Sequence, residues 1–185
     1  MIVRETGIEG LKEIIPVVHH DDRGWFMESY RRNALAQAGI HVEFHQDNMS
    51  WSRQHVIRGL HFQRAPHDQA KLVSVLHGMV LDVAVDLRPN SVTFKKVFTC
   101  RLTATEHNML FIPAGFAHGF HALEDSLFSY KCSAEYQPGA DGGLRWDDPE
   151  LAIRWELPSD VTPHISLKDN GLPTLSELEK GGFFS

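Results

Sequence analysis

The 185-residue chain has few cysteines and no excess of positive charge. Its two cysteines, Cys100 and Cys132, lie in apolar, strand-like segments without metal-site or redox spacing, so we interpret them as buried free thiols. Lysine and arginine total 18 against 24 aspartates and glutamates, a formal net charge of −6. Nucleic-acid polymers select a basic face, so we expect no such partner, although a nucleotide ligand needs only a few local cations.

Export and membrane signals are absent as well. The first residues, MIVRETGIEG, lack the apolar core of a signal peptide, and no apolar run is long enough to span a bilayer. We therefore expect a cytoplasmic protein without a membrane partner. No linker or low-complexity segment divides the chain, and its length is that of one ordinary domain, so we expect residues 1–185 to form a single domain.

Alternation of period two dominates the apolar pattern and predicts strands. Residues 80–87 place Leu81, Val83, Val85 and Leu87 on one face and Val80, Asp82, Ala84 and Asp86 on the other. Similar β-rich segments cover residues 72–78, 96–102 and 126–136, with turn signals at 77–78, 88–90, 106–108 and 113–115. Many short strands with regular turns predict an all-β, antiparallel sandwich or barrel.

Helical signals are few. Residues 32–38 (RNALAQA), followed by Gly39, predict one short helix with a glycine stop. From Leu157 onward the chain has several prolines and little periodicity. We expect this tail to wrap the barrel, with one helical turn at residues 175–179.

The stretch 57–71 (IRGLHFQRAPHDQAK) gathers the side chains best suited to chemistry. Arg58 and His61 lie in a strand-like segment, and Lys71 opens the next apolar run after a turn. On two adjacent strands, a base beside fixed positive charge suits an anionic substrate that must lose a proton. From this stretch alone, a hydrogen-bonded core histidine is an equally good interpretation of His61.

Residues 111–123 (FIPAGFAHGFHAL) contain a motif that bears on the fold. Pro113, Gly115 and His118 form P-x-G-x-x-H, a strand, a tight glycine turn and a histidine that opens the next strand. The spacing resembles the second half of the cupin signature. That resemblance implies a small double-stranded β-helix barrel, or jelly roll, and says nothing about chemistry.

A metal site is the alternative that a cupin barrel raises. Metal-binding cupins use His-x-His with a glutamate a few residues on, so that the side chains converge on one ion. Here Gln63 stands two residues after His61, and Lys71 stands near where the carboxylate would be needed. Because an ammonium repels a dication, we expect no metal and a metal-free acid–base site.

Residues 126–136 (SLFSYKCSAEY) contain a candidate for the general acid that would complement His61. In this segment Phe128, Tyr130 and Cys132 share a face. Tyr130 could be a core tyrosine with a satisfied hydroxyl, the usual fate of a strand tyrosine. It could also be a proton donor across the barrel from His61. Spacing alone does not decide between these interpretations.

An ordered series of short motifs runs along almost the whole chain. In order, the series is Asp21-Asp22-Arg23-Gly24 with Phe26 and Glu28, Gln46-Asp47-Asn48, Arg58-Gly59-Leu60-His61, Lys71-Leu72-Val73, residues 82–88, 111–113 and 118–120, Tyr130-Lys131-Cys132, and residues 146–149 and 166–169. The ordered set resembles the dTDP-4-dehydrorhamnose 3,5-epimerase family.

The resemblance implies a cofactor-independent isomerase of nucleotide sugars. Its substrate would be dTDP-4-dehydro-6-deoxy-D-glucose, epimerised at C3 and C5 to dTDP-4-dehydro-L-rhamnose for dTDP-rhamnose or a related deoxysugar. His61 would be the general base, Tyr130 the general acid on the opposite face, Asp169 the partner of the base, and Lys71 the cation beside the C4 oxygen. Substrate contacts are implied for Arg23, Phe26, Glu28, Gln46, Asp47, Asn48, Arg58, His118, Tyr136, Asp141 and Lys168.

Further expectations concern assembly and stacking. The resemblance implies a homodimer in which residues 23–28 reach into the neighbour's site. Phe26 or Tyr136 would stack on the nucleobase, and Asp141 stands where the family commonly has a glutamate. The alternatives are a C3-only or C5-only epimerase of a related nucleotide 4-keto sugar, a metal-dependent cupin oxygenase or isomerase, and a sugar-nucleotide binding protein without catalysis.

The faces of residues 58–63 raise one geometric problem. Strict alternation puts Gly59, His61 and Gln63 on one face and Arg58, Leu60 and Phe62 on the other. If Arg58 and His61 reach one pocket, the strand must twist or bulge near Gly59, where glycine permits it. Otherwise Arg58 serves a different site, such as one across a subunit interface.

Overall fold

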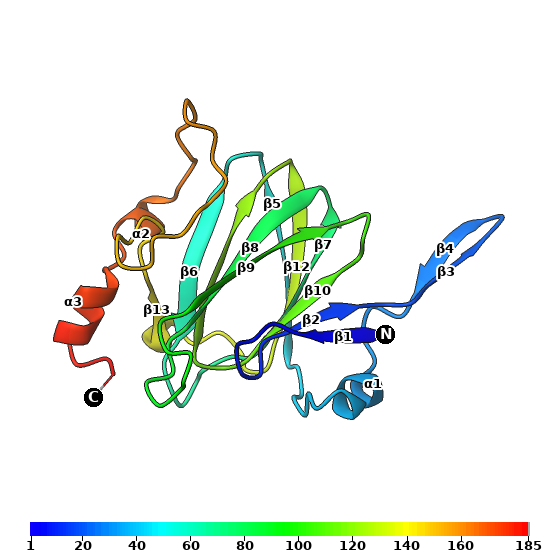
Figure 1. The fold of residues 1–185 in the computed structure, drawn as a ribbon, viewed down its shortest axis with the longest axis horizontal. Coiled ribbons are helices and arrows are strands. Elements are labelled where there is room, and N and C mark those ends of the chain that lie inside the picture. The colour runs from blue at the N-terminus through cyan, green and yellow to red at the C-terminus, as the bar shows by residue number, and fades with distance from the viewer. Residues whose placement is uncertain (185) are drawn as a thin grey trace.

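Two antiparallel sheets form a jelly-roll barrel in the computed structural model, which describes residues 1–184 (Figure 1). The six-stranded sheet has the order β1 (Ile2–Glu5), β2 (Lys12–Ile15), β10 (Met109–Ile112), β7 (Lys71–His77), β12 (Ser126–Cys132) and β5 (Gln46–Ser52). The five-stranded sheet has the order β13 (Asp141–Gly143), β6 (Ile57–Gln63), β11 (Phe116–Ala122), β8 (Met79–Asp86) and β9 (Val97–Thr103). The predicted all-β jelly roll is confirmed.

The alternating strands build the core in layers. Val80 and Ala84 of β8 point inward and pack in the barrel interior with Phe120 and Phe128. Leu81, Val83, Val85 and Leu87 belong to a second cluster on the outer face of the five-stranded sheet. The two faces predicted for residues 80–87 are therefore confirmed. Burial of several large side chains at about 1.5–3 kcal/mol each makes both layers strongly stabilising.

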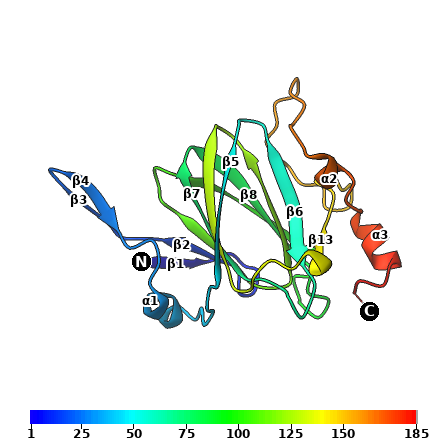
Figure 2. The same ribbon diagram turned by 180° about the vertical axis from the view of Figure 1, so that it is seen from behind.

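The C-terminal tail covers that outer face, as predicted (Figure 2). After the 3₁₀ turn η1 (Pro138–Ala140), the tail contains α2 (Leu167–Asn170) and α3 (Leu175–Lys180). α3 begins with a capping box in which Thr174 and Glu177 bond each other's backbone amides, and it buries Leu175. The predicted turn at 175–179 is confirmed. The short helix α2 was not predicted.

The opposite sheet is covered by the predicted helix α1 (Arg32–Gln37), which ends one residue before the predicted end, and by the chain that follows it. Leu35 and Ile40 pack on Ile14, Leu72 and Phe111 of the outer face. Within residues 1–184, no helix is both long and apolar enough to cross a membrane.

The hairpin of β3 (Val18–Asp21) and β4 (Gly24–Met27) extends away from the barrel, at the end opposite the tail (Figures 1 and 2). Its aromatic side chains Trp25 and Phe26 are exposed by 55% and 65% of their surface. Large apolar side chains on a projecting hairpin indicate a surface suited to a partner.

Three other expectations need correction. β6 and β7 follow each other in sequence but lie in different sheets, so Arg58 and His61 face Lys71 across the barrel instead of along one sheet. Both cysteines are free, as predicted, but only Cys132 is buried, whereas Cys100 is half-buried. The strand expected at 126–136 ends at Cys132.

A bulge in β6 resolves the problem of its two faces. Across β11, His61 pairs with His118 and Arg58 pairs with Phe120, so Gly59 and Leu60 together oppose one residue, Gly119. Gly59 has φ of 102°, and a Cβ there would lie 2.6 Å from the backbone oxygen of His118. The bulge brings Arg58 to the inner face with His61, so strict alternation was wrong for Arg58 and the predicted bulge is confirmed.

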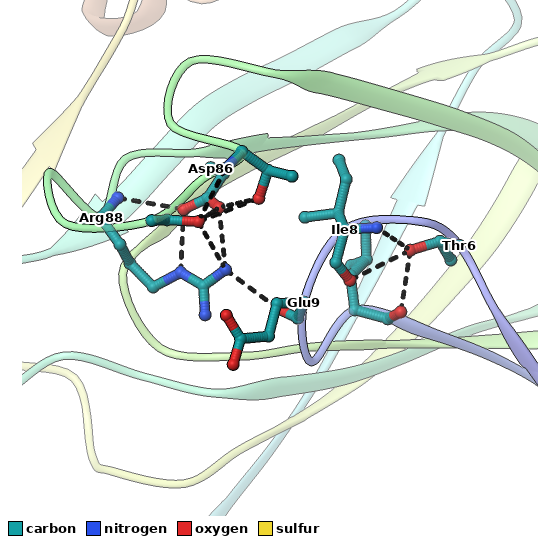
Figure 3. Close-up of polar contacts among 8 residues, drawn as sticks. Thr6, Ile8, Glu9, Asp86 and Arg88 are labelled. Carbon is teal, nitrogen blue, oxygen red and sulfur yellow. Dashed lines mark hydrogen bonds and ion pairs between the residues drawn. The ribbon is translucent and has the colours of Figure 1, made fainter.

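A buried polar network closes the end of β8 around the carboxylate of Asp86 (Figure 3). Arg88 donates to it through Nε at 2.8 Å and through Nη2 at 2.8 Å, and the hydroxyls of Ser91 and Thr93 donate at 2.7 Å each. Arg88 Nη2 also donates to the backbone oxygen of Glu9 at 2.9 Å. The network therefore fixes the N-terminal loop to the β8–β9 turn.

Candidate active site

Two neighbouring cavities of about 530 Å³ and 360 Å³ are lined by residues of both sheets and of the tail. Four residues line both of them: His61, Lys71, Tyr130 and Lys168. The larger cavity also contains Arg58, His118 and Asp169, and the smaller contains Gln46, Asn48, Tyr136 and Asp141. Eleven of the fifteen predicted site residues therefore come together.

The histidine of β6 is paired with a carboxylate from the tail. His61 Nε2 lies 2.8 Å from Asp169 Oδ1, and Asp169 Oδ2 accepts the Gly59 amide at 3.1 Å. Burial alone would raise the pKa of Asp169, but the hydrogen bonds and charge of His61, with the Gly59 amide, hold that pKa below its ordinary value. An ionised Asp169 accepts the Nε2 hydrogen, which leaves Nδ1 of His61 as the basic nitrogen.

The tail reaches this position through its own backbone. His164 exchanges hydrogen bonds with the segment before β6: its oxygen accepts from Ile57 N, and its amide donates to His55 O. Two residues later Ser166 caps α2 by accepting the amide of Asp169 at 3.0 Å. A single helical turn thus aims Asp169 at His61.

Tyr130 stands in the opposite sheet, on β12, and packs against Phe128 with ring centroids 6.0 Å apart. Burial raises the pKa of Tyr130 above its ordinary value. Its hydroxyl has no hydrogen-bond partner within residues 1–184 and lines both cavities, so it is free to act on a ligand. This arrangement favours the proton-donor interpretation over a satisfied core tyrosine.

Lys71 begins β7 and is only 8% exposed. No ion pair holds its ammonium within the described chain. Burial lowers the pKa of Lys71, while the negative charges of Asp82 and Asp141 act in the opposite direction. A buried cation without a direct anionic partner is well placed to stabilise negative charge that develops on a ligand.

His118, on β11, makes a second histidine–carboxylate pair. Its Nε2 lies 2.9 Å from Asp82 Oδ2, and both side chains are buried. The ring also stacks on Phe128, with centroids 6.0 Å apart. The sequence pattern only grouped Asp82 with Val80, Ala84 and Asp86 on one face of its strand. An acid on the inner face of an apolar strand was the signal that could have identified it.

The remaining cavity residues hold one another. Arg58 donates through Nε to Ser52 Oγ at 2.9 Å, and Lys168 pairs with Asp141. Gln46 Nε2 donates to Asn48 Oδ1 at 2.9 Å, and Gln46 Oε1 accepts the amide of Tyr136 at 2.8 Å. Amide, ammonium and guanidinium donors in two neighbouring cavities suit phosphate and base edges.

Four predicted site residues lie outside both cavities. Arg23, Phe26 and Glu28 belong to the projecting hairpin or follow it, and Arg23 pairs with Asp21 at its tip. Asp47 points to the outer face of β5, between the inward Gln46 and Asn48, and pairs with Lys131 at 2.8 Å. Within one chain these four side chains do not reach the cavity.

A resident metal does not fit this site. Among residues 1–184, no group of three or more histidine, cysteine, aspartate or glutamate side chains is arranged to hold an ion. His61 is committed to Asp169, and Lys71 brings a positive charge into the same cavity. A metal-free reaction stays a prediction.

These features define a class: a cupin-like jelly-roll protein with an acid–base cavity between its sheets. The family model for dTDP-4-dehydrorhamnose 3,5-epimerase matches residues 5–177. The chain is 47% identical over 180 residues to the dTDP-4-dehydrorhamnose 3,5-epimerase of Escherichia coli K12, covering 96% of both chains. The chain therefore belongs to the dTDP-4-dehydrorhamnose 3,5-epimerase family.

Solved structures agree with this assignment. An epimerase from Mycobacterium tuberculosis superimposes with a TM-score of 0.94 at 38% identity, covering 98% of this chain and 92% of that one. A dTDP-6-deoxy-D-glucose-3,5-epimerase from Legionella pneumophila, in complex with dTDP-4-keto-L-rhamnose, has a TM-score of 0.91 at 39% identity, covering 97% and 95%.

Proposed function

We propose that this chain epimerises C3 and C5 of dTDP-4-dehydro-6-deoxy-D-glucose and so forms dTDP-4-dehydro-L-rhamnose. As a member of its family the chain is an isomerase. The observation that carries the assignment is the pairing of His61 with Asp169 on one side of a cavity that Tyr130 and Lys71 line from the other sheet. The family match supports the nucleotide sugar as substrate and dTDP-rhamnose or related deoxysugar synthesis as the context.

The chemistry needs groups on two faces of the sugar. The protons on C3 and C5 are both α to the C4 ketone, so the same enolate chemistry serves both carbons. His61 removes the proton from one face, and Asp169 stabilises the imidazolium that results. Tyr130 returns a proton to the other face, which inverts the centre. A single base that returned its own proton would regenerate the starting sugar.

Lys71 stabilises the negative charge that develops on the C4 oxygen. Stabilisation of developing charge by preorganised groups is usually the largest contribution in such reactions. The half-reactions need no redox step and no external cofactor. The absence of a cofactor and of a metal is part of the proposal.

The nucleotide lies, in this proposal, across the smaller cavity. Arg58 of the larger cavity and Lys168, which lines both cavities, hold the diphosphate, while Gln46 and Asn48 contact the nucleoside and Tyr136 stacks on the base. The polar lining of this cavity and its direct connection to His61 and Tyr130 support the arrangement. Asp141 is committed to Lys168 in the free protein, so nucleotide binding must compete with or reuse that ion pair.

A homodimer completes the site in this proposal. Arg23, Phe26 and Glu28 contact substrate in the neighbouring subunit, because the hairpin holds them away from their own cavity. The exposed aromatic side chains of the hairpin support this interface. Sedimentation equilibrium measures the oligomeric state directly. A cytoplasmic location and a single domain over residues 1–185 also stay predictions, the latter supported by the family match over residues 5–177.

Proton NMR of dTDP-4-keto-6-deoxyglucose incubated with the protein in D2O tests the reaction. We expect loss of signal at both C3 and C5 together with formation of the L-sugar. The variants His61→Ala and Tyr130→Phe should each lose about 100-fold or more of the epimerisation rate while retaining dTDP binding. Exchange at one carbon alone would establish a single-centre epimerase, and wild-type turnover by His61→Ala would overturn the assignment of the base.

A further inference from the structure

Asp82 lies behind the cavity wall, on the inner face of β8 between Val80 and Ala84. Its side chain is fully buried, and its Cα pairs with Phe120 of β11. Oδ2 is bonded to His118, whereas Oδ1 has no hydrogen-bond partner within residues 1–184. An ionised carboxylate is expensive to bury unless nearby positive groups compensate it. Unlike Asp86 on the same face, whose carboxylate is held by Arg88, Ser91 and Thr93, Asp82 has one oxygen without a hydrogen-bond partner in the described chain, so its burial requires a reason.

The first reason is the orientation of His118. With Nε2 of the ring bonded to Asp82, Nδ1 is the nitrogen left for a ligand, and no residue in the described chain bonds it. The ring is fixed on its other sides by stacking on Phe128 and by the pairing of its backbone with His61. His118 lines the larger cavity, so this fixed ring belongs to the wall that meets the sugar.

The second reason is the charge of Lys71. This lysine is 8% exposed and lacks an ion pair within residues 1–184. Burial lowers the pKa of Lys71, and Asp82 is one of the groups whose negative charge opposes that effect. The titratable and charged groups that share these cavities with Lys71 are Arg58 and His61 on β6, His118 on β11, Tyr130 and Cys132 on β12, Tyr136 after β12, Asp141 on β13, and His164, Lys168 and Asp169 in the tail.

We propose that Asp82 is a positioning residue for the epimerisation, which fixes the ring of His118 toward the sugar and supplies the counter-charge that keeps Lys71 an ammonium beside the C4 oxygen. The proposal rests on the proposed function, since both partners act on the sugar only if the cavity holds it. Asp82 does not line either cavity and acts through His118 and Lys71.

The variant Asp82→Asn separates charge from shape, because an amide oxygen can still accept from His118 Nε2 while the negative charge is lost. Asp86→Asn is the matched control, since Asp86 is an equally buried carboxylate on the same face of the same strand, outside both cavities. The experiment measures kcat and KM over pH for both variants and the wild type, with dTDP binding and thermal unfolding measured alongside.

We expect Asp82→Asn to lower kcat by about 100-fold, the usual effect of removing one preorganised polar group near developing charge, with KM and dTDP affinity nearly unchanged. The alkaline limb of its kcat profile should move to lower pH, because Lys71 loses its proton more easily without the counter-charge. Asp86→Asn should lose stability but keep the wild-type kcat and alkaline limb.

Failure of this inference is distinct from failure of the proposed function. If the wild type exchanges neither C3 nor C5 in D2O, the proposed function fails. If the wild type is active and Asp82→Asn matches it in kcat and pH profile, or changes no more than Asp86→Asn does, Asp82 is only structural.

If Asp82→Asn does not fold, nitrogen-15 NMR of the wild-type histidines still decides the question. The free enzyme should carry the His118 hydrogen on Nε2 and leave Nδ1 without one. A ring protonated on Nδ1 alone would overturn the proposal.

Discussion

Replacement of Asp86 by asparagine should make the protein less stable by an amount that depends on pH. The hydrogen bonds from Arg88, Ser91 and Thr93 outweigh burial and lower the pKa of Asp86 to about 2, against 3.8 for the unperturbed group (Figure 3). This lowering of the pKa corresponds to about 2 kcal/mol of stability from ionisation at neutral pH. The group is fully buried, so little of this is screened by solvent.

The sign follows from the depressed pKa. The stabilisation is complete above the unfolded pKa near 4 and is lost as pH falls toward 2. Between pH 7 and pH 3, the contribution of ionised Asp86 to the free energy of unfolding should fall by about 1 kcal/mol. Because the other carboxylates are common to both proteins, the stability gap between wild type and Asp86→Asn should narrow by this amount.

Urea unfolding at pH 7 and pH 3, analysed by linear extrapolation, measures the difference in the free energy of unfolding between the wild type and Asp86→Asn. Equal gaps at the two pH values would refute the reasoning, because the charge of Asp86 would then contribute nothing and only its shape would matter. A variant that cannot be distinguished from wild type at pH 7 would show that the network of Figure 3 does not stabilise the fold.

Two further predictions concern the base and the bulge. Asp169→Asn should reduce kcat by about 100-fold or more while dTDP binding, measured by calorimetry, stays unchanged, because His61 keeps its place but loses its charged partner; a kcat near that of wild type would remove Asp169 from the mechanism. Gly59→Ala should destabilise the protein by about 2 kcal/mol or more in urea unfolding, because its φ of 102° and the 2.6 Å approach to His118 O leave no room for a Cβ. Gly139→Ala, with nothing within 4 Å of the added atom, is the control, and equal destabilisation by both would contradict the steric argument.

Much of the fold could be predicted from alternation alone. Residues 80–87 contain a clean period of two, and both of their faces are buried against different layers, so the pattern directly encodes the barrel wall. The short helix at 32–38 was also readable, because a glycine with positive φ ends it. Local sequence is sufficient to predict an element when the residues of that element alone determine its structure.

The sequence predicted less where a backbone irregularity, or a segment distant in sequence, determines where a side chain lies. Alternation alone puts Arg58 on the wrong face, because a bulge adds one residue to β6, and the bulge near Gly59 could be predicted only from the resemblance that brings Arg58 and His61 to one pocket. Lys71 was expected beside Arg58, because sequence neighbours are assumed to pair, whereas the chain crosses to the other sheet. The pairing of Asp82 with His118 could not be predicted, because the two residues lie on different strands, 36 positions apart in sequence.

The site residues also divide into those that a local pattern indicates and those that only the family resemblance assigns. His61, Tyr130, Asp169 and Lys71 were assigned through the family resemblance, and the cavity brings all four together. No periodicity in the tail indicated α2, since a helix of one turn has no repeat to detect. The hairpin residue Arg23 could be assigned only by resemblance, because its own chain offers it no cavity.

The dyad of His61 and Asp169 joins residues 108 positions apart in sequence, one in the barrel wall and one in the tail that closes over it. During synthesis, the barrel strands leave the ribosome well before Asp169 does. A nascent chain can therefore place His61, Lys71 and Tyr130 on its barrel strands before Asp169 and the other tail residues that complete the cavity wall are present. An oriented base therefore forms only after the tail has been synthesised, and loss of the tail would both remove Asp169 and uncover the apolar outer face of the five-stranded sheet.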